Sequence, residues 1–271
     1  MLEILKAVLF GIVEGITECL PISSTGHMIL LNEFVTLDVS EEFWEMFLVV
    51  IQLGAILAVV VLFWDKIFPF DVKKKPFIKK DIFELWFKIL VACIPAAVIG
   101  LAFDDVFDEL FYNPPCVAIA LIVFGIAFII IENRNKNISP RITSLGQLTY
   151  KTVLLIGIFQ LIAAIFPGTS RSGATIVGAL LIGVSRTVAA EFTFFLAIPV
   201  MLGASLLKLL KFGFSFTGTE LTILFAGMVV AFLVSVAVIK FLMGYIKKHD
   251  FKVFGWYRIV LGVLVLLYFM I

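Results

Sequence analysis

The sequence contains little polar chemistry for its length. Its 271 residues include two histidines and three cysteines, charged residues make up 15% of the chain, and 62% of the residues are hydrophobic. A soluble domain is closer to half apolar, and the mean hydropathy of +1.15 excludes that class. The chain is therefore expected to be an integral membrane protein with most of its mass in the bilayer.

The cysteines and the net charge exclude further classes. Cys19, Cys93 and Cys116 lie in apolar runs without the spacing of a disulfide framework or a zinc site. We interpret them as small hydrophobic side chains. The formal net charge of +1 gives no indication of nucleic-acid binding, and we expect none. Residues 1–20 lack a basic leader and a small-residue cleavage site, so no cleaved signal peptide is expected.

Six apolar segments are long enough to cross a bilayer, which takes about 20 residues of helix. Polar or charged connections separate them. The expected spans are residues 46–64, 84–103, 115–131, 188–210, 220–239 and 253–271. The sequence therefore predicts an all-α membrane protein.

Two more apolar segments are interrupted by proline and repeat one design. The first reads GIVEGITECLPISSTGHMIL, residues 11–30, and the second reads GIFQLIAAIFPGTSRSGATIVGAL, residues 157–180. A constant shift of 146 gives the identical pairs Gly11/Gly157, Ile12/Ile158, Ile16/Ile162, Pro21/Pro167 and Ser24/Ser170. The same shift gives the unlike pairs Glu14/Gln160, Glu18/Ala164, Ser23/Thr169 and Thr25/Arg171. One copy thus keeps the carboxylates and the other has the arginine, which suggests two specialised half-sites.

Each broken segment is interpreted as a re-entrant helix pair. Residues 1–20 and 24–34 are individually short for a span. Irregular backbone at membrane depth is tolerated only where protein or a wet cavity receives it. The alternative is one long helix kinked at Pro21.

The repeat extends beyond the broken segments. A shift of 149 gives the identical pairs Glu42/Glu191, Phe43/Phe192, Gly54/Gly203 and Ala55/Ala204. Residues 1–271 then form a single membrane domain, with repeat one at about 1–133 and repeat two at about 147–271. Each repeat has one re-entrant pair and three spans, and three spans end on the opposite face, so we expect inverted topology. Chance coincidence in an apolar sequence is the alternative.

Charged loops predict the orientation. The lysine-rich loop around Lys73 and the loops at Arg134 and Lys247 fall on one face, and acidic loops at Asp38 and Asp104 fall on the other. Because basic loops are retained in the cytoplasm, the first re-entrant pair should open to the outer face of a bacterial plasma membrane. The lysines of the first loop region are Lys66, Lys73, Lys74, Lys75, Lys79 and Lys80.

Two carboxylates are candidates for metal binding or catalysis. Glu14 and Glu18 are four residues apart and share one helix face. Carboxylates in an apolar segment usually face a cavity or a partner. Together they can hold a hard divalent cation, Mg²⁺ or Ca²⁺, with water completing the shell. One of them can instead act as a general base, and a purely structural pair is the third option.

Hydroxyl groups gather where the second helix of each pair begins. Ser23, Ser24 and Thr25 start one helix, and the segment Ser170–Ser172 starts the other. Their simplest role is N-capping, but two helix N-termini that meet at the midplane also suit a ligand with two anionic groups, such as a diphosphate. Arg171 supplies a forked permanent charge for that ligand.

Two further residues extend this candidate site. Thr175, one turn after Arg171, can donate to the same anion. His27, three residues after Ser24, can activate a serine hydroxyl as a neutral imidazole. A structural ion pair between Arg171 and Glu18 is the alternative for the arginine.

These segments closely resemble the bacterial undecaprenyl-diphosphate phosphatases of the bacitracin-resistance type. The resemblance rests on GIVEGITECLPISSTGH, on IQLGAILAVV at residues 51–60 and on PGTSRSGATIVGAL, and it covers essentially the whole chain. It implies hydrolysis of undecaprenyl diphosphate to the monophosphate that carries cell-wall precursors, a divalent metal and an outward-facing active site. It places five residues in the site, Glu14, Glu18, Ser24, His27 and Arg171, with Ser170 and Thr175 assisting at the phosphate.

Two alternatives stay open at this point. Inverted repeats with broken helices are common in transporters, so a carrier or flippase of polyprenyl phosphate or another anionic lipid is the rival function. If the chain is a phosphatase, two mechanisms are possible. Ser24 attacks phosphorus with His27 or Glu18 as base, or a metal-bound water attacks directly. A homodimer is one oligomeric state open to the chain.

Overall fold

The computed structural model describes residues 1–70, 77 and 79–270, without the side chains of residues 101, 104, 105, 108 and 270. Lys73, Lys74 and Lys75 of the predicted basic loop lie outside the described residues. Within these limits the regular elements are helices, and one isolated bridge joins Ile142 to Val184. The expectation of an all-α chain is confirmed.

Six helical segments are long and apolar enough to cross a membrane, and they coincide with the six expected spans. The first is formed by α3 (Glu41–Val50) and α4 (Gln52–Leu62), which meet at Ile51. The others are α6 (Lys80–Phe111), α7 (Pro114–Asn135), α10 (Arg186–Phe212), α11 (Gly218–Tyr245) and α12 (Lys252–Met270). The chain is therefore a multi-pass membrane protein.

One expected loop is helical instead. The acidic residues 104–109 continue α6 as far as Phe111, after a non-helical residue at Phe103. Two short elements also occupy connections, α5 (Trp64–Ile67) and the 3₁₀ helix η1 (Leu145–Gln147).

Four shorter helices form two antiparallel pairs. The first pair is α1 (Leu2–Thr17) with α2 (Ser24–Phe34), and the second is α8 (Tyr150–Ile165) with α9 (Arg171–Ile182). At 16, 11, 16 and 12 residues, none reaches the length of a span. The prolines at Pro21 and Pro167 lie in the turns, where a missing N–H disrupts no helix.

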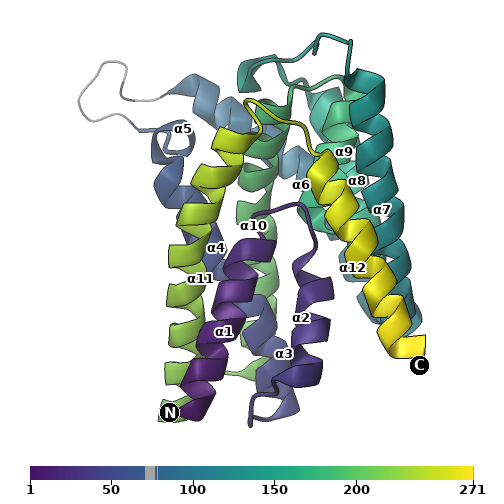
Figure 1. Ribbon diagram of the computed structural model, residues 1–271. Helices are drawn as coiled ribbons and strands as arrows, with labels where there is room; N and C mark the ends of the chain where they lie inside the picture. The colour runs from purple at the N-terminus through teal and green to yellow at the C-terminus, as the bar shows by residue number, and fades with distance from the viewer. Residues whose placement is uncertain (71–76, 78, 271) are drawn as a thin grey trace.

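Each pair returns to the end at which it began. In Figure 1 the N-terminus and the far end of α2 lie at the same lower end of the bundle. There the backbone N–H of Asp38 donates to the Glu3 carboxylate at 2.8 Å. At the end of α9, the Gly183 carbonyl accepts from the backbone N–H of Arg141, in the connection that precedes α8, at 2.8 Å.

The most extensive contacts between the long helices, and those of α1 and α8 with them, are symmetric under exchange of the two halves of the chain. Helix α1 packs on α11 and α8 packs on α6, while α4 contacts α11 and α10 contacts α6; α7 packs on α12. Matching glycines permit the first two contacts. A Cβ atom on Gly11 would lie 2.5 Å from the Gly227 carbonyl oxygen, and one on Gly157 would lie 2.3 Å from the Ala92 carbonyl oxygen. Small residues let helix backbones approach closely where apolar burial gives no net attraction between helices.

Basic connections gather at one end of the bundle. A cavity of about 310 Å³ joins the connections that follow α7, α9 and α11, and Lys247 lines it. Two other lining residues form an ion pair, in which Arg186 Nε donates to Glu132 at 2.9 Å. Lys66, which follows α4, lies 2.7 Å from Glu191 in the second turn of α10. The connections after α4, α7, α9 and α11 therefore share one end.

Candidate active site

The two turns have the same unusual backbone. Ser23 and Ser170 are the non-glycine residues with positive φ in the described chain, at 73° and 67°. Each caps a helix, because the Ser23 hydroxyl accepts from the Gly26 N–H at 3.4 Å and the Ser170 hydroxyl accepts from the Gly173 N–H at 3.1 Å. Backbone strain of this kind persists where the surrounding structure enforces it, and it concentrates at functional sites.

The caps change the alignment of the two broken segments. Ser23 corresponds to Ser170 at a shift of 147, because the second turn holds one extra residue between its proline and its cap. Gly168, with φ of 90°, lies in that longer turn. Ser24 and Arg171 are therefore the equivalent first residues of α2 and α9, whereas the constant shift of 146 paired Ser24 with Ser170. A shift inferred from the first helices cannot detect an insertion in the turn.

Glu18 joins the two half-sites. The Ser24 hydroxyl donates to Glu18 Oε2 at 2.7 Å, and Arg171 Nη2 donates to Glu18 Oε1 at 2.8 Å. The carboxylate thus binds the first residues of both α2 and α9, and Arg171 lies 153 positions after Glu18 in the chain. The ion pair that was the alternative role for Arg171 is present, and it uses only one of the guanidinium nitrogens.

Several buried polar atoms on α1, α8, α9 and the turn between α8 and α9 have no hydrogen-bond partner among the described residues. They are Glu14 Oε1, Arg171 Nε and Nη1, Thr169 Oγ1 and both side-chain polar atoms of Gln160. Glu14 is 1% exposed and lies within electrostatic range of Glu18 and Arg171. Buried polar groups are otherwise satisfied in folded proteins. These atoms are therefore available for a ligand, an ion or water.

The donor set fits a divalent cation only in part. Within the described residues no three His, Cys, Asp or Glu side chains come together. Glu14 offers an unpaired oxygen, whereas both oxygens of Glu18 already accept hydrogen bonds. Hard cations take six or more oxygen ligands. A cation here would need most of its ligands from substrate phosphate and water.

His27 faces away from the serine that it was expected to activate. Its Nδ1 donates to the Ser23 carbonyl oxygen at 2.7 Å, and its Nε2 lies 2.6 Å from the Tyr257 hydroxyl. The ring also stacks on Tyr257, with centroids 5.6 Å apart. Because a neutral imidazole has one donor and one acceptor nitrogen, both are engaged. In this arrangement the partner of the Ser24 hydroxyl is Glu18.

The remaining predicted ligands fall into two groups. Thr25 and Ser172 are the second residues of α2 and α9, and the Ser172 hydroxyl contacts that of Ser170 at 3.1 Å. These residues lie at the helix starts, as expected. Thr175 does not join them. It is fully buried, donates to the Arg171 carbonyl at 2.9 Å and contacts the Thr193 hydroxyl at 2.9 Å. Thr175 therefore contacts the backbone of Arg171, one turn earlier in α9, and the neighbouring helix α10.

Arg258 is the main residue that the sequence analysis missed. It lies in α12 and is fully buried, with 0% of its surface exposed. Its guanidinium donates to backbone carbonyls of both turns. The signal was present in the sequence, since an arginine inside an apolar span is rare and usually functional. Tyr257, the partner of His27, was missed because nothing in its sequence context distinguishes it.

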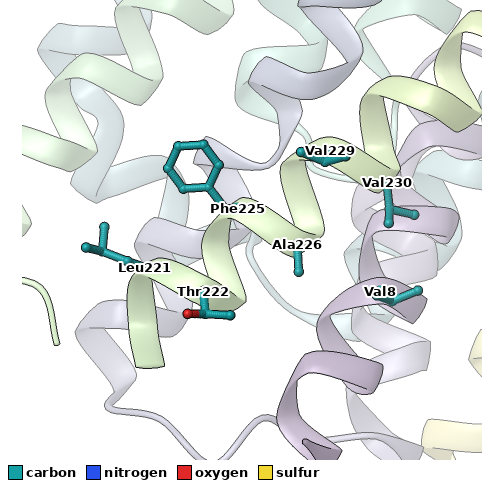
Figure 2. A pocket seen from close by; sticks show the side chains of 7 residues that line it. All are labelled: Val8, Leu221, Thr222, Phe225, Ala226, Val229 and Val230. Atoms are coloured by element: carbon teal, nitrogen blue, oxygen red, sulfur yellow. The ribbon is translucent and has the colours of Figure 1, made fainter. Parts of the chain in front are cut away.

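A groove on the outside of the bundle is separate from this site. Figure 2 shows it between α1 and α11, with a volume of about 540 Å³. Its lining is apolar except for the Thr222 hydroxyl, and Phe225 is 64% exposed. The lining residues are Val8, Leu221, Thr222, Phe225, Ala226, Val229 and Val230. With no charged group, the groove has the character of a lipid-facing surface.

Comparisons with known proteins agree over the whole chain. The family described as bacitracin resistance protein BacA matches residues 7–264. The undecaprenyl-diphosphatase of Desulfitobacterium hafniense is 71% identical over 99% of this chain and 97% of its own length. Undecaprenyl-diphosphatase 1 of Clostridium acetobutylicum is 68% identical over 100% and 98%, and an undecaprenyl-diphosphatase of Enterococcus faecalis is 66% identical over 98% and 97%.

Proposed function

Because the chain belongs to the bacitracin resistance protein BacA family, we propose that it hydrolyses undecaprenyl diphosphate to undecaprenyl phosphate and inorganic phosphate. The observation that carries the proposal is the Ser24–Glu18 hydrogen bond beside two unpaired donors of Arg171. This activity would recycle the lipid carrier of cell-wall synthesis in the bacterial plasma membrane and confer bacitracin resistance.

The first chemical step uses Ser24 as nucleophile. Its oxygen attacks the terminal phosphorus while its proton passes to Glu18 Oε2, 2.7 Å away. The bond from phosphorus to the bridging oxygen breaks, and the electron pair leaves with undecaprenyl phosphate. That leaving group is a phosphate monoester and needs little protonation. Of the two bases considered, the geometry favours Glu18 over His27.

The second step returns the enzyme to its starting state. Water attacks the phosphoserine, the Ser24 oxygen leaves and regains a proton from Glu18, and inorganic phosphate is released. Arg171 Nε and Nη1 have no partner among the described residues, so both would be free to donate to the transferring group, which is where phosphoryl transfer needs electrostatic stabilisation.

Both helix starts can bind the diphosphate. The first two N–H groups of α2 and α9 have no intrahelical acceptor, since the serine caps serve the third. Positive helix-dipole ends add to the attraction for anions. With Arg171 and the hydroxyls of Ser23, Thr25, Ser170 and Ser172, this arrangement suits two adjoining phosphates better than one.

A divalent cation, Mg²⁺ or Ca²⁺, would lie on Glu14, with Glu18 beside it. It would supply charge neutralisation for the phosphate oxygens. The unpaired buried oxygen of Glu14 supports this placement. Glu14 would be the main protein ligand, Glu18 would add the charge of its carboxylate, and substrate phosphate and water would complete the shell.

The two short helix pairs are re-entrant and the halves form an inverted repeat. Three observations support this: each pair returns to its own end, the most extensive helix contacts are symmetric, and the strained caps match. The turns would then meet near the midplane, where transporters with such repeats bind their ligands. No described contact favours a carrier over an enzyme, whereas the Ser24–Glu18 pair is a feature of nucleophilic catalysis.

The site would open to the outer face of the membrane. The shared end of the basic connections supports a cytoplasmic position for that end. A cysteine in place of Asp38 should react with an impermeant thiol reagent in intact cells, and a cysteine in place of Lys248 should react only after permeabilisation. Both positions are exposed. A protein with the three native cysteines replaced provides the background, and the reverse labelling pattern would refute the orientation.

The activity is tested with purified protein in detergent and a polyprenyl diphosphate. Release of inorganic phosphate is expected, and a chelator should reduce it because the Glu14 site would lose its cation. Adding back Mg²⁺ or Ca²⁺ should restore the rate. Full activity after exhaustive chelation would remove the metal from the proposal, and a protein that releases no phosphate would refute the proposed function.

A further inference from the structure

Arg258 has a position that the proposed chemistry does not explain. Its side chain is fully buried in α12, and within the described residues no carboxylate forms an ion pair with it. A charged side chain at membrane depth is expensive. An apolar residue in its place would avoid that cost, so the arginine needs a reason beyond packing.

The guanidinium binds the backbone of both turns. Its Nη1 donates to the Pro21 carbonyl at 3.2 Å, in the turn between α1 and α2. Its Nη2 donates to the Gly168 carbonyl at 3.1 Å and to the Thr169 carbonyl at 2.6 Å, in the turn between α8 and α9. One side chain from the last helix therefore joins two turns that are distant in sequence, since Pro21 and Gly168 are 147 positions apart.

The chemistry of these contacts explains the choice of arginine. The three carbonyl oxygens are hydrogen-bond acceptors with partial negative charge, and together they solvate the guanidinium in place of a carboxylate partner. A guanidinium presents its donors in a planar fork, so that two nitrogens can bind separate groups at once. An ammonium group is a single point and cannot reach both turns in this way.

The turns carry the reacting groups. Glu18 and Ser24 flank the Pro21 turn, and Arg171 follows Thr169 by two residues. We infer that Arg258 is a positioning residue that fixes the separation of the two turns, and thereby the distance from Ser24 and Glu18 to Arg171. The inference rests on the proposed phosphatase site, although Arg258 itself contacts only backbone.

A glycine makes room for this contact. A Cβ atom on Gly173 would lie 2.6 Å from Arg258 Nη1. The clash would fall on the end of a flexible side chain, so Gly173→Ala should displace the guanidinium and keep its charge. Gly173→Ala tests whether the position of the guanidinium matters, and Arg258→Lys tests whether its planar, forked shape matters.

The experiment compares Arg258→Lys and Gly173→Ala with Arg186→Lys as the matched control. Arg186 also ties two helices together, through Glu132, but at the far end of the bundle. Both test variants should lower kcat by about 10- to 100-fold per folded molecule, with KM changed by less than about threefold, because small misplacements act on the chemical step. The control should keep its kcat.

Hydrogen exchange gives a second readout that does not depend on activity. Amide exchange should accelerate in residues 19–24 and 166–172 together in the test variants, and in neither segment in the control. If Arg258→Lys does not yield folded protein, Gly173→Ala decides alone. Normal kcat and normal amide exchange in the test variants would overturn the inference. A raised KM with unchanged kcat would also overturn it, because it would assign Arg258 to substrate binding. A wild-type protein without phosphatase activity would refute the proposed function, while the exchange data would still test whether Arg258 holds the two turns.

Discussion

Ser24→Ala is expected to remove nearly all phosphatase turnover, by about three orders of magnitude or more. Its hydroxyl is the group that Glu18 Oε2 can deprotonate, and alanine leaves no oxygen to attack phosphorus. If water attacks phosphorus directly and Ser24 only donates a hydrogen bond, the variant should lose about 1 kcal/mol of stabilisation, or several-fold in rate. The measurement is kcat of the purified variant with a polyprenyl diphosphate.

Ser205→Ala is the matched control for this change. Like Ser24, Ser205 donates a hydrogen bond from its hydroxyl, in this case to the Val49 carbonyl at 3.3 Å, but it is buried in α10 against α3. Its variant should keep normal kcat. Trapping a phosphoserine at position 24 by rapid quench would establish the covalent route. A Ser24→Ala enzyme with substantial activity would exclude Ser24 as nucleophile.

Arg171→Lys should lower kcat by about 100-fold or more with the fold retained. In the native protein one nitrogen binds Glu18 and two buried nitrogens remain unpaired. A lysine can keep the Glu18 ion pair, but it has no second and third donor in a fixed plane for the phosphoryl oxygens. The charge is therefore conserved and the phosphate contact is lost.

The expected signature is a low kcat in a protein with near-native thermal stability. Arg186→Lys serves again as the arginine-to-lysine control. Near-normal turnover of Arg171→Lys would show that the unpaired nitrogens do not bind phosphate. A large loss of stability with a normal kcat would instead assign Arg171 to the structural ion pair alone.

The sequence by itself determined the spans, the two broken segments and the family. Spans are readable because a bilayer demands about 20 apolar residues and internal backbone hydrogen bonding, which are local properties of a segment. Proline and short length marked the breaks at Pro21 and Pro167 for the same reason. Scarcity of charge made Glu14, Glu18 and Arg171 conspicuous, since ionisable groups in apolar segments are costly.

Only the tertiary structure decided how these residues meet. The extra residue in the second turn places Ser24 opposite Arg171, and their meeting at Glu18 depends on packing between segments 153 positions apart. The direction of His27 depends on Tyr257, which comes from the last helix. Arg258 shows the limit most clearly, because an arginine in an apolar span signals a function, but its partners are backbone carbonyls. Every residue has a carbonyl, so sequence cannot reveal which ones a buried guanidinium will bind.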